Sequence, residues 1–326
     1  MPPETPGDQI AVDPFKQGNI ADEASHIVQE GARLLGQFKP GRQNETPTIG
    51  VATMNADGSI MLDLHTHGGI EADAHLKYNR NDRLYGEISE HLGGLKPGQV
   101  KIVQPWNDQI QREDITTPPG GGNDGGQQPG DATPKPKPAP VAPSADFSNR
   151  VNDTYNGLPQ NVRDALAKDG VKVVPTDKVT DIMPELAGQK PRGWPPGSSW
   201  DDVDGAYDIG GKRIIVAQRQ SSPTPTTNDI AGLTRHETGH AVDHLHNFSS
   251  RADFQTAYDR EVAVVPTADT QPLDYFLQKG DAGREETFAE TFAITNGGAT
   301  APIRETLMKK DFPDTIKIVI DQTSKL

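Results

Sequence analysis

The sequence predicts an α+β protein in two parts, a small N-terminal module and a larger C-terminal domain. Three observations predict it: a stretch without apolar periodicity at residues 116–145, short alternating runs typical of strands, and longer runs with helical spacing. A chain of 326 residues usually forms about two domains. We therefore expect domains at residues 1–115 and 146–326.

The segment between these two domains has the composition of a linker. Residues 116–144 contain almost only Pro, Gly, Ala, Gln, Thr, Asp, Asn and Lys. Such a segment cannot bury a core, so we expect a connection at 116–145 that is flexible in its Gly-rich half and extended in its Pro-rich half.

The N-terminal module should be a small α+β unit. Apolar residues alternate on both sides of a turn at residues 55–58, which predicts a hairpin, and Gly93 marks the end of a helix. The expected elements are strands over 49–54, 60–64 and 100–103 and a helix over 86–92. The module could recognise a substrate, a secretion machine or another partner, and nothing in its sequence selects among these.

The C-terminal domain shows mixed periodicity. We expect helices at residues 158–166 and from 311 onward, where Ile316, Val319 and Ile320 can pack one face, and strands at 171–174 and on either side of the Gly-Gly turn within 205–217. The loop at 191–200 contains Trp194 and Trp200. Its tryptophans could line a cleft or anchor the loop on the core.

Residues 236–240 form the pattern His-Glu-x-x-His. On a helix, His236 and His240 lie one turn apart on the same face, so both imidazoles can bind one metal ion, with Glu237 beside it. Zinc held by three protein ligands keeps a position open for water and lowers the pKa of that water to about 7. A third ligand must come from elsewhere in the chain.

A second helical run, at residues 284–293, offers carboxylates. Phe288 and Phe292 repeat at a spacing of four residues, and so do Glu286 and Glu290. The run therefore predicts a helix that packs through Phe and Ala and presents two carboxylates. Acidic residues on a helix are usually a solvated face, but the nearby His-Glu-x-x-His favours a metal ligand.

Together, the two motifs resemble the catalytic domain of anthrax lethal factor and its relatives, which include the bacterial Pro-Pro endopeptidases. The likeness covers about residues 146–326. It implies a zincin-like fold, with an active-site helix, a small mixed sheet with an edge strand, and C-terminal helices. It also implies zinc as cofactor and a protein or peptide substrate.

The resemblance assigns roles to individual residues. It implies that His236, His240 and Glu286 are the zinc ligands and that Glu237 is the general base. Glu290 would accept a hydrogen bond from the other ring nitrogen of a ligand histidine and so orient it, with Asp243 as a weaker candidate for that role. Glu285 is the rival ligand; Glu286 is preferred because Glu286 and Glu290 reproduce the family's spacing, whereas Glu285 lies about 100° around the helix.

The family also has a tyrosine upstream of the glutamate ligand that stabilises the oxyanion. This chain departs from that pattern, since Lys279 stands seven residues before Glu286 and the nearest tyrosine is Tyr275. Glycines in the intervening loop could let Tyr275 reach the metal, or Tyr275 could simply pack in the core. Lys279 or Arg284 are the alternative donors.

Substrate capture in proteases of this plan uses an edge strand above the active-site helix. Ile214, Ile215 and Val216 are the candidates for this edge, because extended peptides can be bound through main-chain hydrogen bonds. An ordinary hairpin would give the same pattern.

The N-terminal module contains a second motif with two histidines. His65 and His67 resemble the His-x-His of amidohydrolase barrels, whose imidazoles also bind metal. That fold needs around 200 residues or more of barrel, and too few remain before the linker. The hairpin is the preferred interpretation.

Composition excludes several classes of function. The formal net charge is −14 without a basic stripe, which argues against a nucleic-acid partner. The apolar runs are too short for a membrane span, and the first residues lack the pattern of a secretory signal. The absence of cysteine excludes disulfides. We expect a cytoplasmic protein or one exported by a non-standard bacterial route.

Two hypotheses follow for the function. The first is a zinc metalloendopeptidase, in the setting of a secreted bacterial toxin or effector. The second is a catalytically silent zinc-binding recognition protein of the same fold, which the displaced tyrosine suggests. The intact Glu237 favours the first, since a silent site has no use for a general base.

Overall fold

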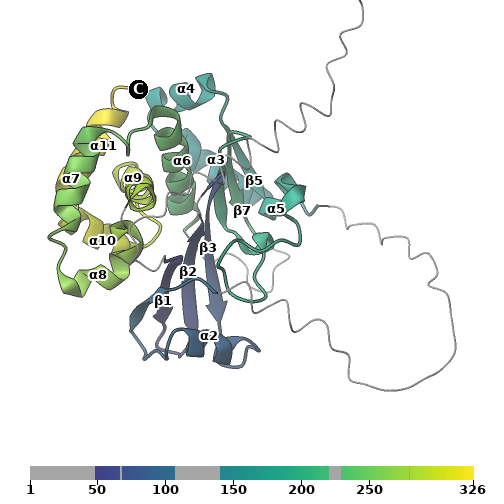
Figure 1. Ribbon diagram of the computed structural model, residues 1–326. Helices are drawn as coiled ribbons and strands as arrows, with labels where there is room; N and C mark the ends of the chain where they lie inside the picture. The colour runs from purple at the N-terminus through teal and green to yellow at the C-terminus, as the bar shows by residue number, and fades with distance from the viewer. Residues whose placement is uncertain (1–47, 67, 107–139, 220–228, 279) are drawn as a thin grey trace, which may run out of the picture. The chain divides into compact units, whose positions relative to one another are not determined.

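The computed structural model of the chain describes residues 48–66, 68–106, 140–219, 229–278 and 280–326. They form one seven-stranded sheet with helices packed against it, which confirms the α+β class (Figure 1). Residues 1–47 and most of the predicted linker lie outside the described part of the chain.

The N-terminal strands follow the prediction with one addition. The expected hairpin is formed by β1 (Gly50–Met54) and β2 (Ile60–Thr66), and α2 (Tyr85–His91) and β4 (Val100–Val103) also lie where they were predicted. The strand β3 (Ile70–Tyr78) was not predicted. Its inner face contains the small residues Ala72 and Ala74, which give a weak strand signal.

The C-terminal strands are β5 (Lys172–Thr176), β6 (Gly205–Asp208) and β7 (Arg213–Ala217), as expected from the sequence. They continue the N-terminal strands in one sheet of order β4-β1-β2-β3-β6-β7-β5, in which only β5 and β7 are parallel. The junction is the antiparallel pair of β3 and β6. The domain boundaries at residues 115 and 145 stay a prediction.

The prediction that Ile214, Ile215 and Val216 form an open edge was wrong. The strand that contains them, β7, pairs with β6 on one side and with β5 on the other. All three side chains are fully buried. A continuous apolar run of this kind is typical of an interior strand covered on both faces, whereas a half-exposed strand alternates.

The helices supply the framework of the C-terminal half. Figure 1 shows α6 between the sheet and α9, with α7, α10 and α11 beyond α9. The helices are α3 (Ala145–Asn156), α4 (Gln160–Lys168), α5 (Val179–Ile182), α6 (Ile230–His246), α7 (Ala252–Val262), α8 (Thr267–Leu273), α9 (Asp281–Thr295), α10 (Pro302–Asp311) and α11 (Pro313–Thr323), with 3₁₀ turns η2 (Pro184–Leu186), η3 (Trp200–Asp202) and η4 (Asp274–Leu277).

The predicted helices at residues 158–166, 236–240, 284–293 and 311 onward are confirmed by α4, α6, α9 and α11. The predicted packing face of α11 was partly wrong, because Val319 is buried but Ile320 is 51% exposed. The buried stripe instead runs through Phe312 and Thr315.

The loop at residues 191–200 is anchored on the core. Trp194 is fully buried, and its indole N–H donates to the main-chain oxygen of His65 at 3.2 Å. Trp200 is also buried in the same apolar cluster, together with Leu62 and Leu64 of β2. The two tryptophans therefore join the loop to the sheet and do not line a cleft.

The amidohydrolase alternative is excluded by the sheet. His65 lies on β2, which pairs antiparallel with β1 and with β3, whereas that barrel is parallel. Its motif partner His67 lies outside the described residues.

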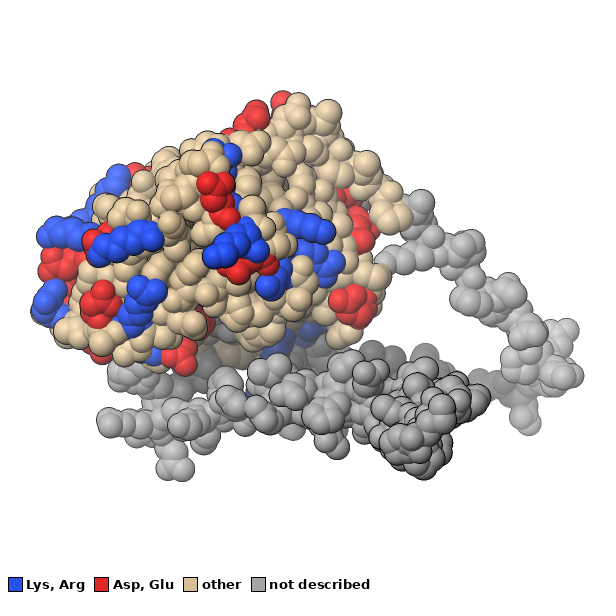
Figure 2. All heavy atoms as spheres, turned by 90° about the horizontal axis from the view of Figure 1, so that it is seen from above, with Lys and Arg blue, Asp and Glu red and all other residues tan. Residues whose placement is uncertain are grey.

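Surface features agree with the composition. On the face in Figure 2, basic and acidic side chains are interspersed and no large patch of one sign appears. Among the helices that the structure describes, none has the length and apolarity needed to cross a membrane.

Candidate active site

Helix α6 brings His236, Glu237 and His240 to the face of the sheet. Its start is fixed by Asp229, whose side chain accepts a hydrogen bond from the amide of Ala231. One helical turn separates the two histidines, and their Nε2 atoms lie 3.1 Å apart. Both imidazoles are buried and point toward the same position, as binding of one shared metal ion requires.

Helix α9 approaches α6 closely enough to add a carboxylate. The contact occurs at Gly239, where a Cβ atom would lie 2.7 Å from the Cα of Ala289, so the motif needs glycine at that point. Glu286 then places Oε2 3.3 Å from His236 Nε2 and Oε1 3.5 Å from His240 Nε2. The donor atoms of these three residues all lie within 4.8 Å of one another.

The structure distinguishes the two candidate glutamates. Glu286 is buried in this cluster, whereas Glu285, the next residue on α9, is partly exposed. A step of about 100° along the helix separates the two side chains. The donor set therefore contains Glu286.

Glu290 lies one turn further along α9 and contacts the other nitrogen of His236. Its Oε2 is 2.9 Å from His236 Nδ1. Its Oε1 accepts hydrogen bonds from the hydroxyl of Thr300 at 2.9 Å and from the amide of Thr300 at 3.3 Å. Glu290 is thus fixed from two sides and can hold the imidazole of His236 in one orientation.

Asp243 has a different environment from the one proposed for it. Its carboxylate accepts a hydrogen bond from the amide of Ser249 at 2.7 Å, beyond the end of α6. Burial raises the pKa of Asp243 to about 6. This contact ties the turn after α6 to the helix, which is a structural task.

Glu237 is fully buried beside the donor set. Neither carboxylate oxygen has a hydrogen-bond partner among the described residues. The side chain lies against Gly205 of β6, where a Cβ atom would meet Glu237 Oε1 at 2.5 Å. Burial, followed by the negative charge of Asp73, raises the pKa of Glu237 well above its usual value.

Tyr275 lies in η4 and reaches the same site, although the sequence left this open. Its ring is stacked on the imidazole of His65, with 3.6 Å between the ring centroids. Burial, and then the carboxylates of Glu286 and Asp73, raise the pKa of its hydroxyl. Of the alternative donors, Arg284 is paired with Asp281 and Lys279 lies outside the described residues.

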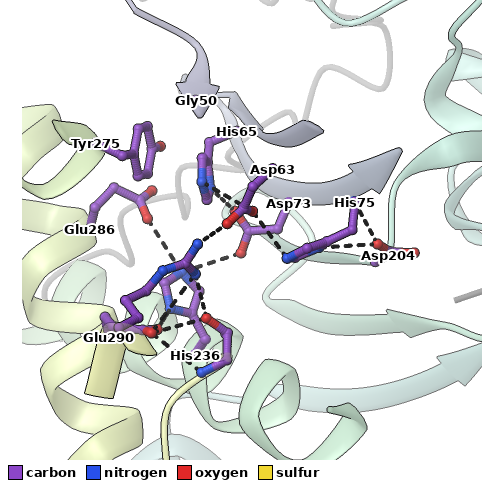
Figure 3. A network of polar contacts seen from close by, with 12 residues as sticks. Gly50, Asp63, His65, Asp73, His75, Asp204, His236, Tyr275, Glu286 and Glu290 are labelled. Carbon is purple, nitrogen blue, oxygen red and sulfur yellow. Dashed lines mark hydrogen bonds and ion pairs between the residues drawn. The ribbon is translucent and has the colours of Figure 1, made fainter. Parts of the chain in front are cut away.

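A set of residues that sequence reasoning missed also faces the site. Polar residues on one face of β2 and β3 point toward α6 and α9 (Figure 3). We call this set the polar face; its members are Asp63, His65, Glu71, Asp73 and His75. The signal that could have revealed it is the alternation of these residues with Leu62, Leu64, Ala72 and Ala74.

The charges of the donor set are strongly coupled. Burial opposes ionisation of Glu286, but His240 and His236 outweigh it and lower its pKa to about 2. Burial likewise favours neutral His236, yet the carboxylates of Asp73, Glu286 and Glu290 raise its pKa. Burial lowers the pKa of His240. The cluster thus contains more negative groups than its histidines can balance, which favours a cation.

Comparison with known proteins identifies the family. The family model described as anthrax toxin lethal factor, N- and C-terminal domain, matches residues 142–319, more than half of the chain. The chain belongs to this family.

Two relatives of the chain are named Pro-Pro endopeptidases. One, from Paenibacillus alvei, is 30% identical over 152 residues, which cover 42% of this chain and 68% of the relative. The other, from Clostridioides difficile, is 33% identical over 163 residues, which cover 47% of this chain and 68% of the relative. A solved structure of the Paenibacillus alvei Pro-Pro endopeptidase aligns with a TM-score of 0.40 at 26% identity, covering 56% of this chain and 96% of that chain.

The donor set of this lethal factor family member suits a metal ion. Zinc binds imidazole nitrogen and carboxylate oxygen at about 2.0–2.2 Å, and a tetrahedron with such bonds separates its donor atoms by about 3.3 Å. The 3.1 Å between the Nε2 atoms of His236 and His240 fits this value, and Glu286 approaches each histidine with a different oxygen, Oε2 at 3.3 Å from His236 and Oε1 at 3.5 Å from His240. One oxygen of Glu286 can complete the set, because the donor atoms of the three residues lie within 4.8 Å of one another. The carboxylate oxygens of the neighbouring Glu237, buried without partners, indicate that a further polar group belongs there.

Proposed function

We propose that the chain is a zinc-dependent metalloendopeptidase that hydrolyses peptide bonds in protein substrates. The observation that carries the proposal is the buried donor set His236, His240 and Glu286, with separations of 3.1–3.5 Å and with Glu237 against it. Membership of a family whose matched relatives are named endopeptidases supports the same activity.

Each residue of the site has a task that its surroundings support. When bound, a zinc ion would polarise the scissile carbonyl and lower the pKa of a water molecule. Glu237, with its raised pKa, would accept a proton from water and later donate it to the leaving amine. Tyr275, which its raised pKa keeps protonated, would donate a hydrogen bond to the carbonyl oxygen as negative charge develops there.

The strand nearest to Glu237 defines where substrate would bind. Both edges of β6 are paired in the described structure, with β3 and with β7. An extended peptide that took the place of β3 beside β6 would pass in front of Glu237, because Glu237 lies against Gly205 of β6. Peptides with consecutive prolines are the first substrates to test, since both relatives are named for that sequence.

The test combines metal analysis with proteolysis of a peptide library that includes Pro-Pro sequences, on the wild type and on Glu237→Gln. One zinc per chain in both proteins, with cleavage only by the wild type, is the expected result. Zinc in both without cleavage by either would favour the silent zinc-binding recognition protein. A wild type without zinc would contradict the proposed site.

A further inference from the structure

Within the C-terminal part of the chain, residues 145–326, which we call the peptidase half, β6 is the outer strand of the sheet on one side. Residues 172–217 form three adjacent strands in the order β6-β7-β5, and β6 is the outer strand on the side of Glu237. An edge strand next to the general base is the position at which an extended substrate pairs through main-chain hydrogen bonds.

That edge is already paired with the N-terminal half of the chain. The strand β3 runs antiparallel to β6, with Ala72 opposite Ala206 and Asp73 opposite Gly205. Asp73 therefore lies opposite Gly205, a residue of β6 against which Glu237 lies. A peptide substrate cannot add to β6 while β3 is in this place, because each strand edge pairs only once.

Asp73 also approaches one member of the metal donor set. Its Oδ2 is 3.3 Å from His236 Nε2, the same separation as that between His236 Nε2 and Glu286 Oε2. Donor atoms that share a tetrahedral zinc ion lie about 3.3 Å apart. The donor atoms of Asp73 group with those of His65 and Glu286, and do not lie within 4.8 Å of all three donors of the His236, His240 and Glu286 set. Coordination of the same ion by Asp73 therefore needs a shift toward the other donors, and it would fill the position that an active zinc site keeps open for water.

The orientation of Asp73 is fixed by the rest of the polar face. His65 Nδ1 contacts the other oxygen of Asp73, Oδ1, so Oδ2 is left toward His236 (Figure 3). The ring of His65 is in turn covered by Tyr275. His65, which holds Asp73 in place, is therefore buried at the site and is not part of a solvated strand surface.

Two further contacts hold β2 and β3 against the peptidase half. Asp63 is paired with the buried Arg304 of α10, and the amide of His75 donates to Asp204 at 2.8 Å. Arg304 also approaches Glu290 Oε1 at 3.9 Å. Residues of the polar face on both β2 and β3 thus contact charged side chains of the peptidase half.

We propose that β3 is a built-in occupant of the substrate cleft and that Asp73 is a fourth ligand of the zinc ion, so that the described form is a latent peptidase. This inference rests on the proposed function. Activation requires that β3 leave β6, which opens the edge and returns one zinc position to water. In this proposal, the bond between the zinc ion and Asp73 stabilises the latent form.

The first test compares Asp73→Asn with the wild type in the full-length chain, with zinc affinity measured by competition with a chelator. Loss of a ligand should weaken zinc binding by about tenfold or more, since changes to outer-shell partners already cost about 10–100-fold. Cleavage of a peptide should become at least about tenfold faster, as expected when the competent form was populated at about 10% or less.

The matched control is Glu71→Gln. Glu71 lies on the same face of β3 two residues before Asp73 and acts on His240 through its charge, but it supplies no atom to the donor set. Because Glu71 acts on His240 only through its charge, Glu71→Gln should change zinc affinity and cleavage rate by clearly less than Asp73→Asn does. Equal changes in the two variants would overturn the proposal, because charge alone would then explain them.

A second test does not depend on removing Asp73. The chain has no cysteine, so Ala72→Cys with Ala206→Cys can form a single disulfide across the β3–β6 pair. The oxidised protein should bind zinc but not cleave peptides, and reduction should restore cleavage to the wild-type rate. Equal cleavage by the oxidised and reduced forms would show that substrate does not need this edge and would overturn the proposal.

The outcomes separate failure of this inference from failure of the proposed function. If the chain is no peptidase, no variant cleaves in either redox state. If the chain is a peptidase without a latent strand, wild type and Asp73→Asn cleave at equal rates and hold zinc equally well. Two zinc ions per chain, falling to one in Asp73→Asn, would also overturn the proposal, because Asp73 would then belong to a separate site with His65.

Discussion

The two sides of the site hold their polar groups by different means. On the helical side, formed by α6 and α9, the residues His236, His240 and Glu286 are fixed by short spacings within helices that pack at Gly239. On the strand side, the polar face depends on the pairing of β3 with β6 and on ion pairs such as Asp63 with Arg304.

This difference bears on which side can move. Separating α9 from α6 would expose Phe288 and Phe292, which are fully buried in the larger apolar core. Separating β3 from β6 breaks one four-residue strand pair and several polar contacts, and it also divides the smaller apolar core, in which Ala72 and Ala74 of β3 share a cluster with Ala206 of β6. The helical side is therefore held by apolar packing between helices, whereas release of the strand side has to expose a part of the smaller core.

The largest effect should come from the helical side. The substitution Glu286→Ala removes the carboxylate that lies beside both histidines. Zinc content should therefore fall from one ion per chain to near zero, and peptide cleavage should fall to background. Elemental analysis and a peptide assay measure both. Glu285→Ala, one residue away on the same helix, is the control and should retain zinc content and cleavage. Loss of zinc and cleavage in Glu285→Ala, with both retained in Glu286→Ala, would reverse the ligand assignment.

The strand side should contribute to stability through Arg304. In Arg304→Met the buried Asp63 loses its guanidinium partner, which costs about 3 kcal/mol when one partner of a buried pair is removed. Urea denaturation measures this loss. The control Arg260→Met breaks a pair with Asp314 whose side chains are 59% and 44% exposed, and it should cost less than about 1 kcal/mol. Equal losses would mean that the polar face is not tightly held.

The two sides meet at Gly205, which lies between Glu237 and Asp73. Gly205→Ala places a Cβ atom 2.5 Å from Glu237 Oε1, so the general base must shift. A displacement of about 1 Å can reduce kcat by about 100-fold, whereas zinc content should not change. In the control Gly210→Ala, the new Cβ lies 3.7 Å from Asp208 Oδ1, so activity should be retained. Full activity of Gly205→Ala would argue against Glu237 as the base.

The smallest effect concerns the orientation of His236. Glu290→Gln keeps the shape of the side chain but removes the charge that faces His236 Nδ1 at 2.9 Å. Zinc affinity should fall by about 10–100-fold, with one zinc per chain retained at saturating metal. Chelator competition measures the change. An affinity equal to that of the wild type would show that Glu290 only bonds Thr300 and does not orient the ligand.

The same contrast explains what the sequence could reveal. His236, Glu237, His240 and Glu286 have spacings fixed by the helical repeat, so their pattern can be recognised without knowing the fold. Tyr275 was a candidate that only the structure could place, because the path of η4 depends on the packing of α8 and α9. Local signals thus predicted the helical side.

The strand side escaped sequence analysis for a physical reason. Asp73 reaches the site only because β3 pairs with β6, about 130 residues later in the chain, and no local rule specifies that partner. The misplaced edge at Ile214, Ile215 and Val216 has the same origin. A strand can be recognised from its residues, whereas its neighbours in the sheet cannot.

The most direct test of the latent site is a crystal structure of the zinc-bound full-length chain, with the metal located by anomalous scattering at the zinc edge. The account predicts one zinc ion within about 2.2 Å of His236, His240, Glu286 and Asp73, with β3 still paired to β6. A zinc ion that binds water in place of Asp73, beside an unpaired β6, would contradict it.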